Sequence, residues 1–175
     1  ENDITAIYEG DPAAQSRLEV IKTYPGFKAI AAYRIANSIY NSGYQLIARM
    51  ISEHAHSRTG VDIHPAAKIG SHFCIDHGTG IVIGETTDIG DHVKIYQGVT
   101  LGATSVKKEN ASQKRHPTIG NNVVIYANAT ILGGKTHIGD HCVIGGNSWI
   151  TRSLESNSRL YYDSENKHLL KSNLE

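Results

Sequence analysis

Aliphatic residues recur at every sixth position over most of the chain from Val61 onward. They form four sets: Ile63, Ile69, Ile75 and Ile81; Ile83, Ile89, Ile95 and Leu101; Ile119, Ile125 and Ile131; and Ile138, Ile144 and Ile150. Neither the period of a helix nor the alternation of an ordinary strand explains this spacing. A glycine often follows the aliphatic residue, as in Ile83-Gly84, and lets the chain turn a corner. The pattern predicts a hexapeptide-repeat parallel β-helix, in which each short strand sends one aliphatic side chain inward.

The segment before Val61 shows a helical pattern instead. In "GDPAAQSRLEVI", Asp11 is placed as an N-cap and Pro12 as the first helical residue. A second helix is predicted from Pro25 to a stop near Gly43, and a third ends near Gly60. We therefore expect about three helices within 1–60, a β-helix over 61–155 and a C-terminal tail over 156–175.

One segment inside the predicted β-helix lacks the six-residue spacing. It covers 103–118, "ATSVKKENASQKRHPT", and is rich in Lys, Ser and Asn. We interpret it as a loop that leaves the solenoid, and long loops in compact domains are often functional. Its basic residues are Lys107, Lys108, Lys114 and Arg115. They form either an ordinary solvated surface or a site for a phosphate-bearing ligand.

Composition narrows the classes of partner. Lys and Arg number 17, as do Asp and Glu, so the formal net charge is zero. This balance argues against a general binder of nucleic acid or of anionic membranes. Cys74 and Cys142 are not a close pair, and both are expected as reduced core residues. The sequence has no long apolar run and no visible signal peptide, so a cytoplasmic location is expected.

Histidines are numerous, ten in 175 residues, and most are expected at corners or turns. His77 is different because Asp62 precedes it by nearly one coil of three hexapeptides. A carboxylate on the adjacent coil would orient the imidazole and make His77 a good general base. Asp76 could bind a substrate ammonium, and Arg115 with His116 could bind a carboxylate. No Ser or Cys nucleophile stands out nearby, which favours direct transfer.

Seven segments together resemble the serine O-acetyltransferase family: "DPA", "GFKAIAAYRIA", "VDIHPAAKIG", "DHGTGIVIGET", "GVTLGA", "KRHPTIG" and "ILGG". They occur in order from Asp11 to about Ile150. The resemblance implies a left-handed parallel β-helix and a homotrimer with active sites between chains. It also implies transfer of acetyl from acetyl-CoA to the hydroxyl of L-serine, giving O-acetyl-L-serine for cysteine synthesis, with no metal cofactor.

The resemblance assigns roles residue by residue. It makes His77 the general base and Asp62 its partner. Asp11 and Asp76 resemble the residues that hold the serine amino group. Arg115 and His116 resemble the pair that binds the serine carboxylate, and His116 also supports the reacting centre. The arm of CoA is expected along four backbone positions: Ala103, Thr104, Ala127 and Gly146.

Further expectations concern regulation and assembly. L-cysteine shares the ammonium and carboxylate of serine, so it is expected as a feedback inhibitor. The helices here resemble the last part of the larger helical domain that is usual in the family. Because the earlier helices of that domain join two trimers in the family, a trimer is expected for this chain, with a hexamer as the alternative. The C-terminal tail of the family, which usually ends in Ile, can insert into the active site of O-acetylserine sulfhydrylase. This chain ends "KSNLE", and because a terminal Glu places a carboxylate where an apolar side chain is needed, weak or no binding is expected for this end. The chain also has "SLESNSRLYYDSENK" where "AGVPA" is usual, which affects the CoA contacts there.

Three other functions each fit part of the pattern. The first is another hexapeptide O-acetyltransferase that acts on sugar or xenobiotic hydroxyls. The second is a zinc enzyme of the γ-carbonic-anhydrase kind, suggested by the spacing of His72 and His77. The third is a scaffold without catalysis. The helical motifs argue against the first. A metal site would explain neither Asp62 nor the "RHP" loop, which argues against the second, and Asp62, His77 and His116 argue against the third.

Overall fold

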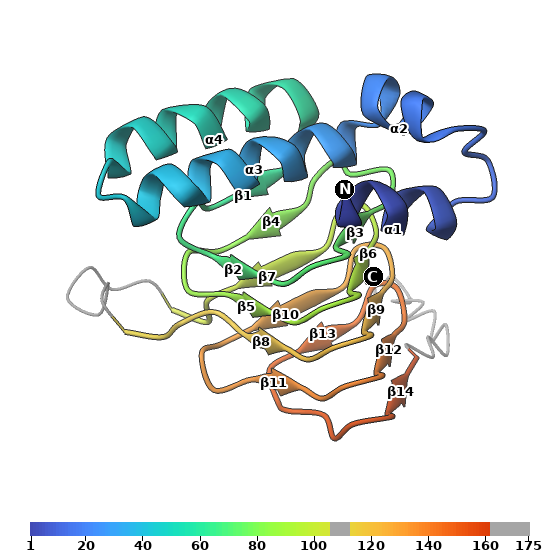
Figure 1. The fold of residues 1–175 in the computed structure, drawn as a ribbon. Helices are drawn as coiled ribbons and strands as arrows, with labels where there is room; N and C mark the ends of the chain where they lie inside the picture. The colour runs from blue at the N-terminus through green and yellow to red at the C-terminus, as the bar shows by residue number, and fades with distance from the viewer. Residues whose placement is uncertain (106–112, 162–175) are drawn as a thin grey trace, which may run out of the picture.

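The protein is a left-handed parallel β-helix covered at one end by four helices (Figure 1). The structure is a computed structural model and describes residues 1–105 and 113–161. Lys107, Lys108 and the tail from residue 162, with its "KSNLE" end, lie outside the described residues. The predicted fold class is confirmed.

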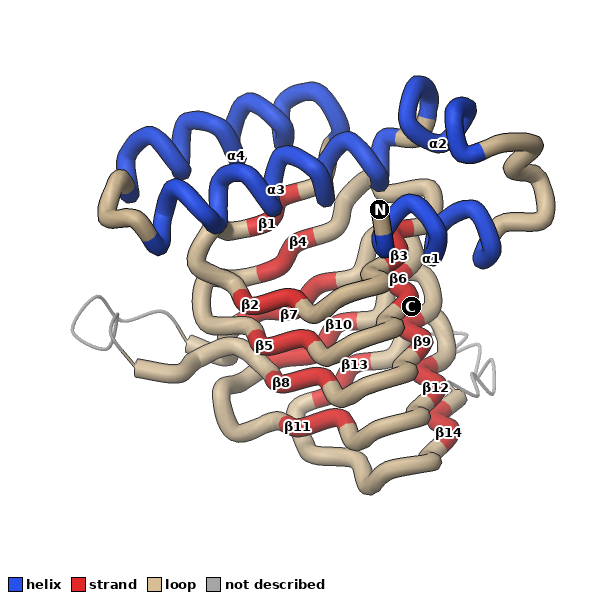
Figure 2. The backbone as a smooth tube through the Cα atoms, viewed as in Figure 1, coloured by secondary structure: helices blue, strands red, loops and turns tan. Residues whose placement is uncertain are grey.

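Three parallel sheets form the sides of the solenoid (Figure 2). Face A contains β1 (Asp62–Ile63), β4 (Val82–Ile83), β7 (Thr100–Gly102), β10 (Thr130–Leu132) and β13 (Trp149–Ile150). Face B contains β2 (Lys68–Ile69), β5 (Asp88–Ile89), β8 (Thr118–Ile119) and β11 (His137–Ile138). Face C contains β3 (Cys74–Ile75), β6 (Lys94–Ile95), β9 (Val124–Ile125), β12 (Val143–Ile144) and β14 (Arg159–Leu160). The chain passes from face A to B to C, so each coil has three edges, here called AB, BC and CA.

The recurring aliphatic residues stack inside the solenoid as predicted. Ile63 lies over Ile83, and Ile83 over Leu101, in the register of face A. Such side chains are almost fully buried, so they form one continuous core. Burial at about 25 cal/mol per Å² of apolar surface makes this column the main source of stability.

The first coil is longer than the expected three hexapeptides. Three hexapeptides would bring the chain from Asp62 back to the same place at Gly80, but Asp62 pairs with Val82. Cys74 likewise pairs with Lys94 on face C. The additional residues lie in the CA edge around His77, where a wider corner connects β3 to β4. The expectation of three hexapeptides per coil was therefore wrong at this point of the chain.

The solenoid also continues beyond residue 155, where the sequence analysis placed its end. The strand β14 pairs in parallel with β12, and Leu154 bridges to Ile138. Leu154 and Leu160 keep the six-residue spacing, and both pack against the core. Ile150 and Leu154 are only four residues apart, so the six-residue spacing is interrupted before this last coil, which is why the sequence analysis missed it.

Four helices precede the solenoid where about three were expected: α1 (Asn2–Gly10), α2 (Arg17–Thr23), α3 (Pro25–Asn41) and α4 (Gln45–Thr59). The predictions for α3 and α4 were close, and Gly60 caps α4 in the left-handed conformation. The predicted cap at Asp11 was wrong. Asp11 follows α1 at its C-terminal end, and Ser16 caps α2 through a bond to the N–H of Glu19.

Tertiary contacts explain the helix that sequence analysis missed. Ile7 of α1 is buried against the solenoid. Asp3 accepts hydrogen bonds from the N–H of Phe73, at 2.9 Å, and from the guanidinium of Arg34. These partners lie far away in sequence, so the local pattern of α1 gave little indication of it.

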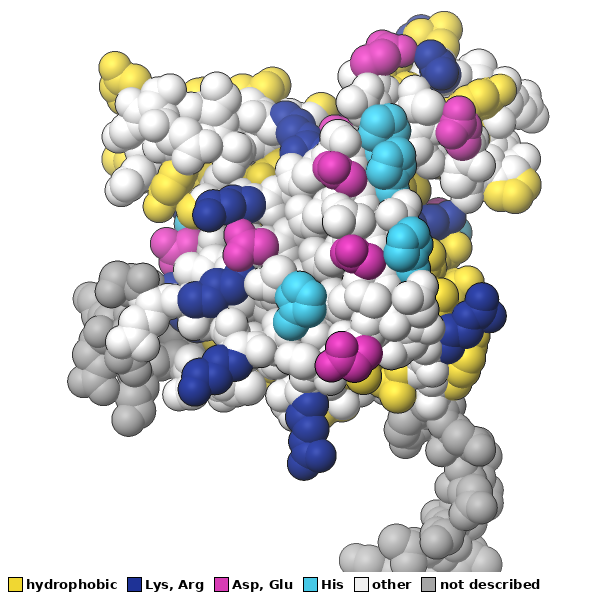
Figure 3. All heavy atoms as spheres, turned by 60° about the horizontal axis from the view of Figure 1, so that its bottom comes forward, with side chains coloured by type: hydrophobic (Ala, Val, Ile, Leu, Met, Phe, Trp, Pro, Cys, Tyr) yellow, Lys and Arg dark blue, Asp and Glu magenta, His cyan; other side chains and the backbone are white. Residues whose placement is uncertain are grey.

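Many histidines occupy corners, as expected. His72, His77, His92 and His141 all have positive φ between 55° and 59°. Asparagine takes the same conformation at other corners, for example Asn122. Histidine and asparagine tolerate this region better than most residues. Figure 3 shows histidines with acidic side chains beside them on one face of the molecule.

Within residues 1–105 and 113–161, none of the helices combines the length and the apolar character that a membrane span requires.

Candidate functional site

The residues singled out from the sequence lie mainly on the two edges that border face A. The CA edge carries Asp76, His77, Ala127 and Gly146, and the AB edge carries Ala103, Thr104, Arg115 and His116. Asp62 is on the first strand of face A, between these edges. In one chain a whole sheet separates the two groups, so one copy alone does not bring them together.

A cavity of about 420 Å³ lies beside the CA edge. Its lining residues are Asp11, Thr23, Tyr24, Pro25, Gly26, Ile75, Asp76 and His77. Gly26 is required there because a Cβ would come within 2.3 Å of the carbonyl oxygen of Ile75. The structure thus places three of the predicted residues, Asp11, Asp76 and His77, around one space.

Asp11 is held as a carboxylate. The hydroxyl of Tyr24 donates to its Oδ2 at 2.5 Å, and the N–H of Ala13 donates to its Oδ1 at 2.8 Å. The bond from Tyr24, followed by that from Ala13, lowers the pKa of Asp11 below its usual value. The same bond raises the pKa of Tyr24 to about 12. An ionised Asp11 suits the recognition of a cationic group.

Asp76 and His77 lie side by side with different exposure. Oδ1 of Asp76 is 3.8 Å from Nε2 of His77, and the His77 side chain is 70% exposed. Oδ2 of Asp76 is 3.0 Å from Nζ of Lys94. Sequence analysis missed both Lys94 and Tyr24 as neighbours of this cavity. No motif indicated them, because β6 and the end of α2 reach the cavity only through the fold.

His116 is buried at the AB edge and held by Thr86. Its Nδ1 accepts a hydrogen bond from the N–H of Thr86 at 3.1 Å and lies 2.9 Å from Oγ1 of Thr86. Because a backbone N–H can only donate, the neutral ring carries its proton on Nε2. Burial, then the charge of Arg115, lowers the pKa of His116 to about 4. His116 is therefore a neutral donor at neutral pH.

Gly84 provides the space that His116 occupies. A Cβ at residue 84 would lie 2.0 Å from Cδ2 and 2.1 Å from Nε2 of the His116 ring. The motif "GIVIGET" thus contains both Gly84, which admits the ring, and Thr86, which binds it. Thr86 was not singled out from the sequence, although it belongs to a quoted motif.

Arg115 and Lys114 are oriented by acidic neighbours. Arg115 forms an ion pair with Glu85. Lys114 pairs with Asp88 at 2.6 Å and donates to the carbonyl oxygen of Thr86 at 2.5 Å. These contacts fix the end of the loop, so Lys114 and Arg115 are more than solvated surface charges.

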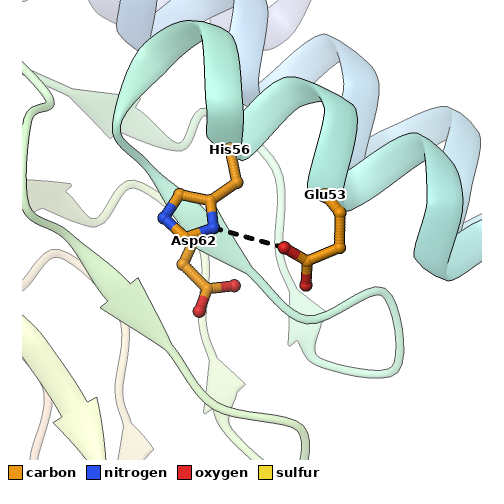
Figure 4. A group of neighbouring side chains, drawn as sticks. All are labelled: Glu53, His56 and Asp62. Atoms are coloured by element: carbon orange, nitrogen blue, oxygen red, sulfur yellow. Dashed lines mark hydrogen bonds and ion pairs between the residues drawn. The ribbon is translucent and has the colours of Figure 1, made fainter.

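Asp62 lies under the end of α4, near Glu53 and His56 (Figure 4). The ligand atoms of these three side chains lie within 4.8 Å of one another. Glu53 is already paired with Arg49 at 2.5 Å and with Nδ1 of His56 at 3.4 Å. Ion pairing therefore accounts for two of the three side chains, Glu53 and His56, and we assign no metal to the group.

The contact between Asp62 and His77 stays a prediction. The segments that carry them are in contact: the N–H of Gly80 donates to the carbonyl of Gly60 at 2.8 Å, and a Cβ at Gly78 would lie 3.2 Å from the side chain of Val61. Within residues 1–105 and 113–161, however, no hydrogen bond or ion pair joins Asp62 to His77.

The predicted CoA positions fall into two pairs. Ala127 and Gly146 lie on adjacent coils, where a Cβ at Gly146 would come within 3.0 Å of the carbonyl oxygen of Ala127. Ala103 and Thr104 follow β7, and a Cβ at Gly133 would lie 3.4 Å from the methyl of Thr104. Their contact with CoA stays a prediction.

The structure does not support the zinc alternative. His72 is on the BC edge, where its ring stacks on that of His92 at a centroid distance of 4.2 Å. His77 is on the CA edge, a whole sheet away. Among the described residues, the one group with metal-ligand spacing contains neither His72 nor His77.

Comparison with known proteins gives consistent results. Residues 116–152 match the bacterial transferase hexapeptide family (six repeats). A plasmid serine acetyltransferase of Synechococcus elongatus is 52% identical over 163 residues, 90% of this chain and 51% of that protein. A serine acetyltransferase of Staphylococcus aureus is 50% identical over 157 residues, 90% of this chain and 71% of that protein.

Solved structures agree. Serine acetyltransferase isoform 3 of Entamoeba histolytica, in complex with cysteine, superposes with a TM-score of 0.87 at 44% identity, covering 98% of this chain and 60% of that one. A serine acetyltransferase in complex with CoA gives 0.84 at 37% identity, covering 91% and 64%. This chain thus spans about half of the Synechococcus relative and 60% of the Entamoeba chain. By sequence identity, coverage and fold, the chain belongs to the serine acetyltransferase family.

Proposed function

We propose that this chain transfers the acetyl group of acetyl-CoA to the hydroxyl of L-serine, giving O-acetyl-L-serine for cysteine synthesis. The observation that carries the proposal is the cavity lined by Asp11, Asp76 and His77. It combines two acidic side chains, suited to an ammonium, with an exposed imidazole, suited to proton transfer. Serine carries an ammonium close to a hydroxyl, which matches this arrangement.

In the proposed reaction, His77 removes the proton of the serine hydroxyl as its oxygen attacks the acetyl carbonyl. The carbon–sulfur bond then breaks, and the CoA sulfur leaves with the proton that His77 had taken. No covalent enzyme intermediate is required. General-base catalysis of this kind typically contributes a factor of about 10²–10⁴. Asp62 would stabilise the imidazolium that forms at His77.

The AB edge supplies complementary groups. Arg115 would bind the serine carboxylate, and Nε2–H of the neutral His116 would donate a hydrogen bond to the carboxylate or to the reacting centre. Because these residues and His77 border opposite sides of face A, we propose that the site forms between the CA edge of one copy and the AB edge of another. The arm of CoA would run along four positions on the same two edges: Ala103, Thr104, Ala127 and Gly146.

A cyclic trimer satisfies this requirement, since each copy then contributes both edges once. Face A also exposes apolar side chains, with Val82 at 38% and Trp149 at 71% exposure, which a neighbouring copy would cover. We propose a homotrimer, with a hexamer as the alternative.

Regulation and partners follow from the same chemistry. L-cysteine has the ammonium and carboxylate of L-serine, so we propose that it binds in place of serine and inhibits. The bound cysteine of the Entamoeba relative supports this proposal. A cytoplasmic location and binding of O-acetylserine sulfhydrylase by a native tail are also proposed; no nucleic-acid or membrane partner is proposed.

The test is release of free thiol from acetyl-CoA. L-serine should support it, whereas sugar and xenobiotic hydroxyls should not. The variant His77→Asn should lower turnover by about 10²-fold or more. Full activity of His77→Asn would contradict the mechanism, and preference for a sugar would favour the other class of acetyltransferase.

A further inference from the structure

Lys94 is a partly buried cation next to the proposed serine cavity. It lies on β6, one coil below Cys74 in the register of face C, and its side chain is 19% exposed. Its outward side chain passes beneath the end of α1, where a Cβ at Gly10 would lie 3.7 Å from Nζ. No motif of the sequence analysis included Lys94, and the proposed reaction does not use it.

The ammonium of Lys94 makes three contacts that join separate elements. Nζ donates to the carbonyl oxygen of Gly10, at 2.7 Å, and lies 3.0 Å from Oδ2 of Asp76. It also lies 4.8 Å from the centroid of the Tyr96 ring. Burial is the largest single influence and lowers the pKa of Lys94, but the hydrogen bonds to Asp76 and Tyr96 and the charge of Asp76 together outweigh it, so the pKa is raised. Lys94 is therefore charged whenever Asp76 is ionised.

These contacts determine how two carboxylates face the cavity. Gly10 directly precedes Asp11, so the bond to its carbonyl fixes the backbone from which Asp11 projects. The pairing with Oδ2 of Asp76 leaves Oδ1, on the side of His77, for another cation. Lys94 also offsets one of the two negative charges. Without it, Asp11 and Asp76 would repel each other, Asp76 would lose its ion-pair partner, and the backbone before Asp11 would lose the bond at Gly10.

We propose that Lys94 is a positioning residue: it ties Asp76 to the end of α1 so that Asp11 and Asp76 converge on one substrate ammonium. The kinetic consequence of this inference rests on the proposed function, whereas the contacts of Lys94 with Gly10 and Asp76 are a property of the structure. It makes the amino-acid end of the site depend on a residue that does not touch the substrate.

The test compares Lys94→Met with Lys94→Arg and with Lys68→Met. Methionine keeps much of the aliphatic length and removes the charge. Lys68 is the matched control, because it is also an outward lysine on a short strand, β2, and pairs with an aspartate, Asp88, at 3.9 Å. Its side chain is largely exposed and reaches neither α1 nor the cavity residues.

We expect Lys94→Met to raise the KM for L-serine about tenfold, the size typical of losing a charged hydrogen bond. The KM for acetyl-CoA should stay unchanged and kcat should change little, because the lost interaction positions the ground state and the transition state alike. Inhibition by L-cysteine should weaken by the same factor. Lys94→Arg should restore part of the loss, and Lys68→Met should behave as the wild type.

A second measurement does not require activity. Hydrogen exchange at the amides between Gly10 and Ala14 should become faster in Lys94→Met and stay unchanged in Lys68→Met. If the wild type uses L-serine but Lys94→Met matches Lys68→Met in both measurements, the inference is wrong. If both KM values and kcat change together as thermal stability falls, Lys94 is only structural and the inference also fails. If the wild type does not use L-serine at all, the proposed function fails, while hydrogen exchange still shows whether Lys94 holds the backbone after α1 in place.

Discussion

Replacing Gly84 by alanine tests whether the position of His116 matters for catalysis. The added Cβ would lie 2.0 Å from Cδ2 and 2.1 Å from Nε2 of the imidazole. Carbon atoms prefer separations of about 3.5–4.0 Å, so the ring must move by roughly 1.5 Å. The ring is buried and held by Thr86, which means that it cannot move without weakening these hydrogen bonds.

Two effects of different size follow from this displacement. Overpacking in a dense interior typically costs about 1–3 kcal/mol of unfolding free energy. A catalytic group displaced by about 1 Å can cost roughly 10²-fold in rate. We therefore expect Gly84→Ala to remain folded but to lose turnover by about two orders of magnitude. Thiol release with acetyl-CoA and L-serine measures the rate, and urea unfolding measures the stability.

Gly90→Ala is the matched control. Gly90 follows Ile89 as Gly84 follows Ile83, and its added Cβ would lie 2.6 Å from Oδ1 of Asn121. It is at the BC edge, which carries none of the proposed site residues, so it should lose comparable stability and keep its turnover. Wild-type turnover in Gly84→Ala, or an equal loss of turnover in both variants, would refute the role of His116.

Four other outcomes are expected. The pKa of His116 is about 6.5 in the unfolded state and about 4 in the folded state, so the unfolded state binds the proton first as the pH falls. This difference contributes on the order of 3 kcal/mol to the free energy of unfolding above pH 6.5, and the contribution is lost as the pH falls to 4. In urea unfolding, the free energy of unfolding of His116→Gln should depend less on pH over this range than that of the wild type. Arg115→Ala should weaken L-serine and L-cysteine together in calorimetric titrations, and loss of only one would show that they do not share this contact. Trp149→Glu should shift the proposed trimer toward smaller species in light scattering, because an unpaired charge would be buried between copies, and a fully active monomer would contradict a site between copies. Asp62→Asn should lower kcat less than His77→Asn does, since it acts only through the imidazole.

The sequence alone determined the solenoid and pointed to the corner that carries the proposed catalytic residues. A six-residue spacing is a local property, because each short strand buries its own aliphatic side chain, as Ile83 and Ile89 do. Family motifs likewise identified Asp76 and His77, and the structure puts both beside one cavity.

Only the tertiary structure decided the surroundings of these residues. The sequence shows a two-residue offset between Ile81 and Ile83, but only the strand register shows that this offset closes the first coil at Val82 rather than at Gly80, through the wide corner around His77. The cap assigned to Asp11 was wrong because α1 forms through distant contacts, including that of Asp3 with the backbone of the solenoid. Lys94 was missed for the same reason. An ion pair or a buried ring depends on side chains that meet across coils, and no local pattern records which coil lies beside which helix.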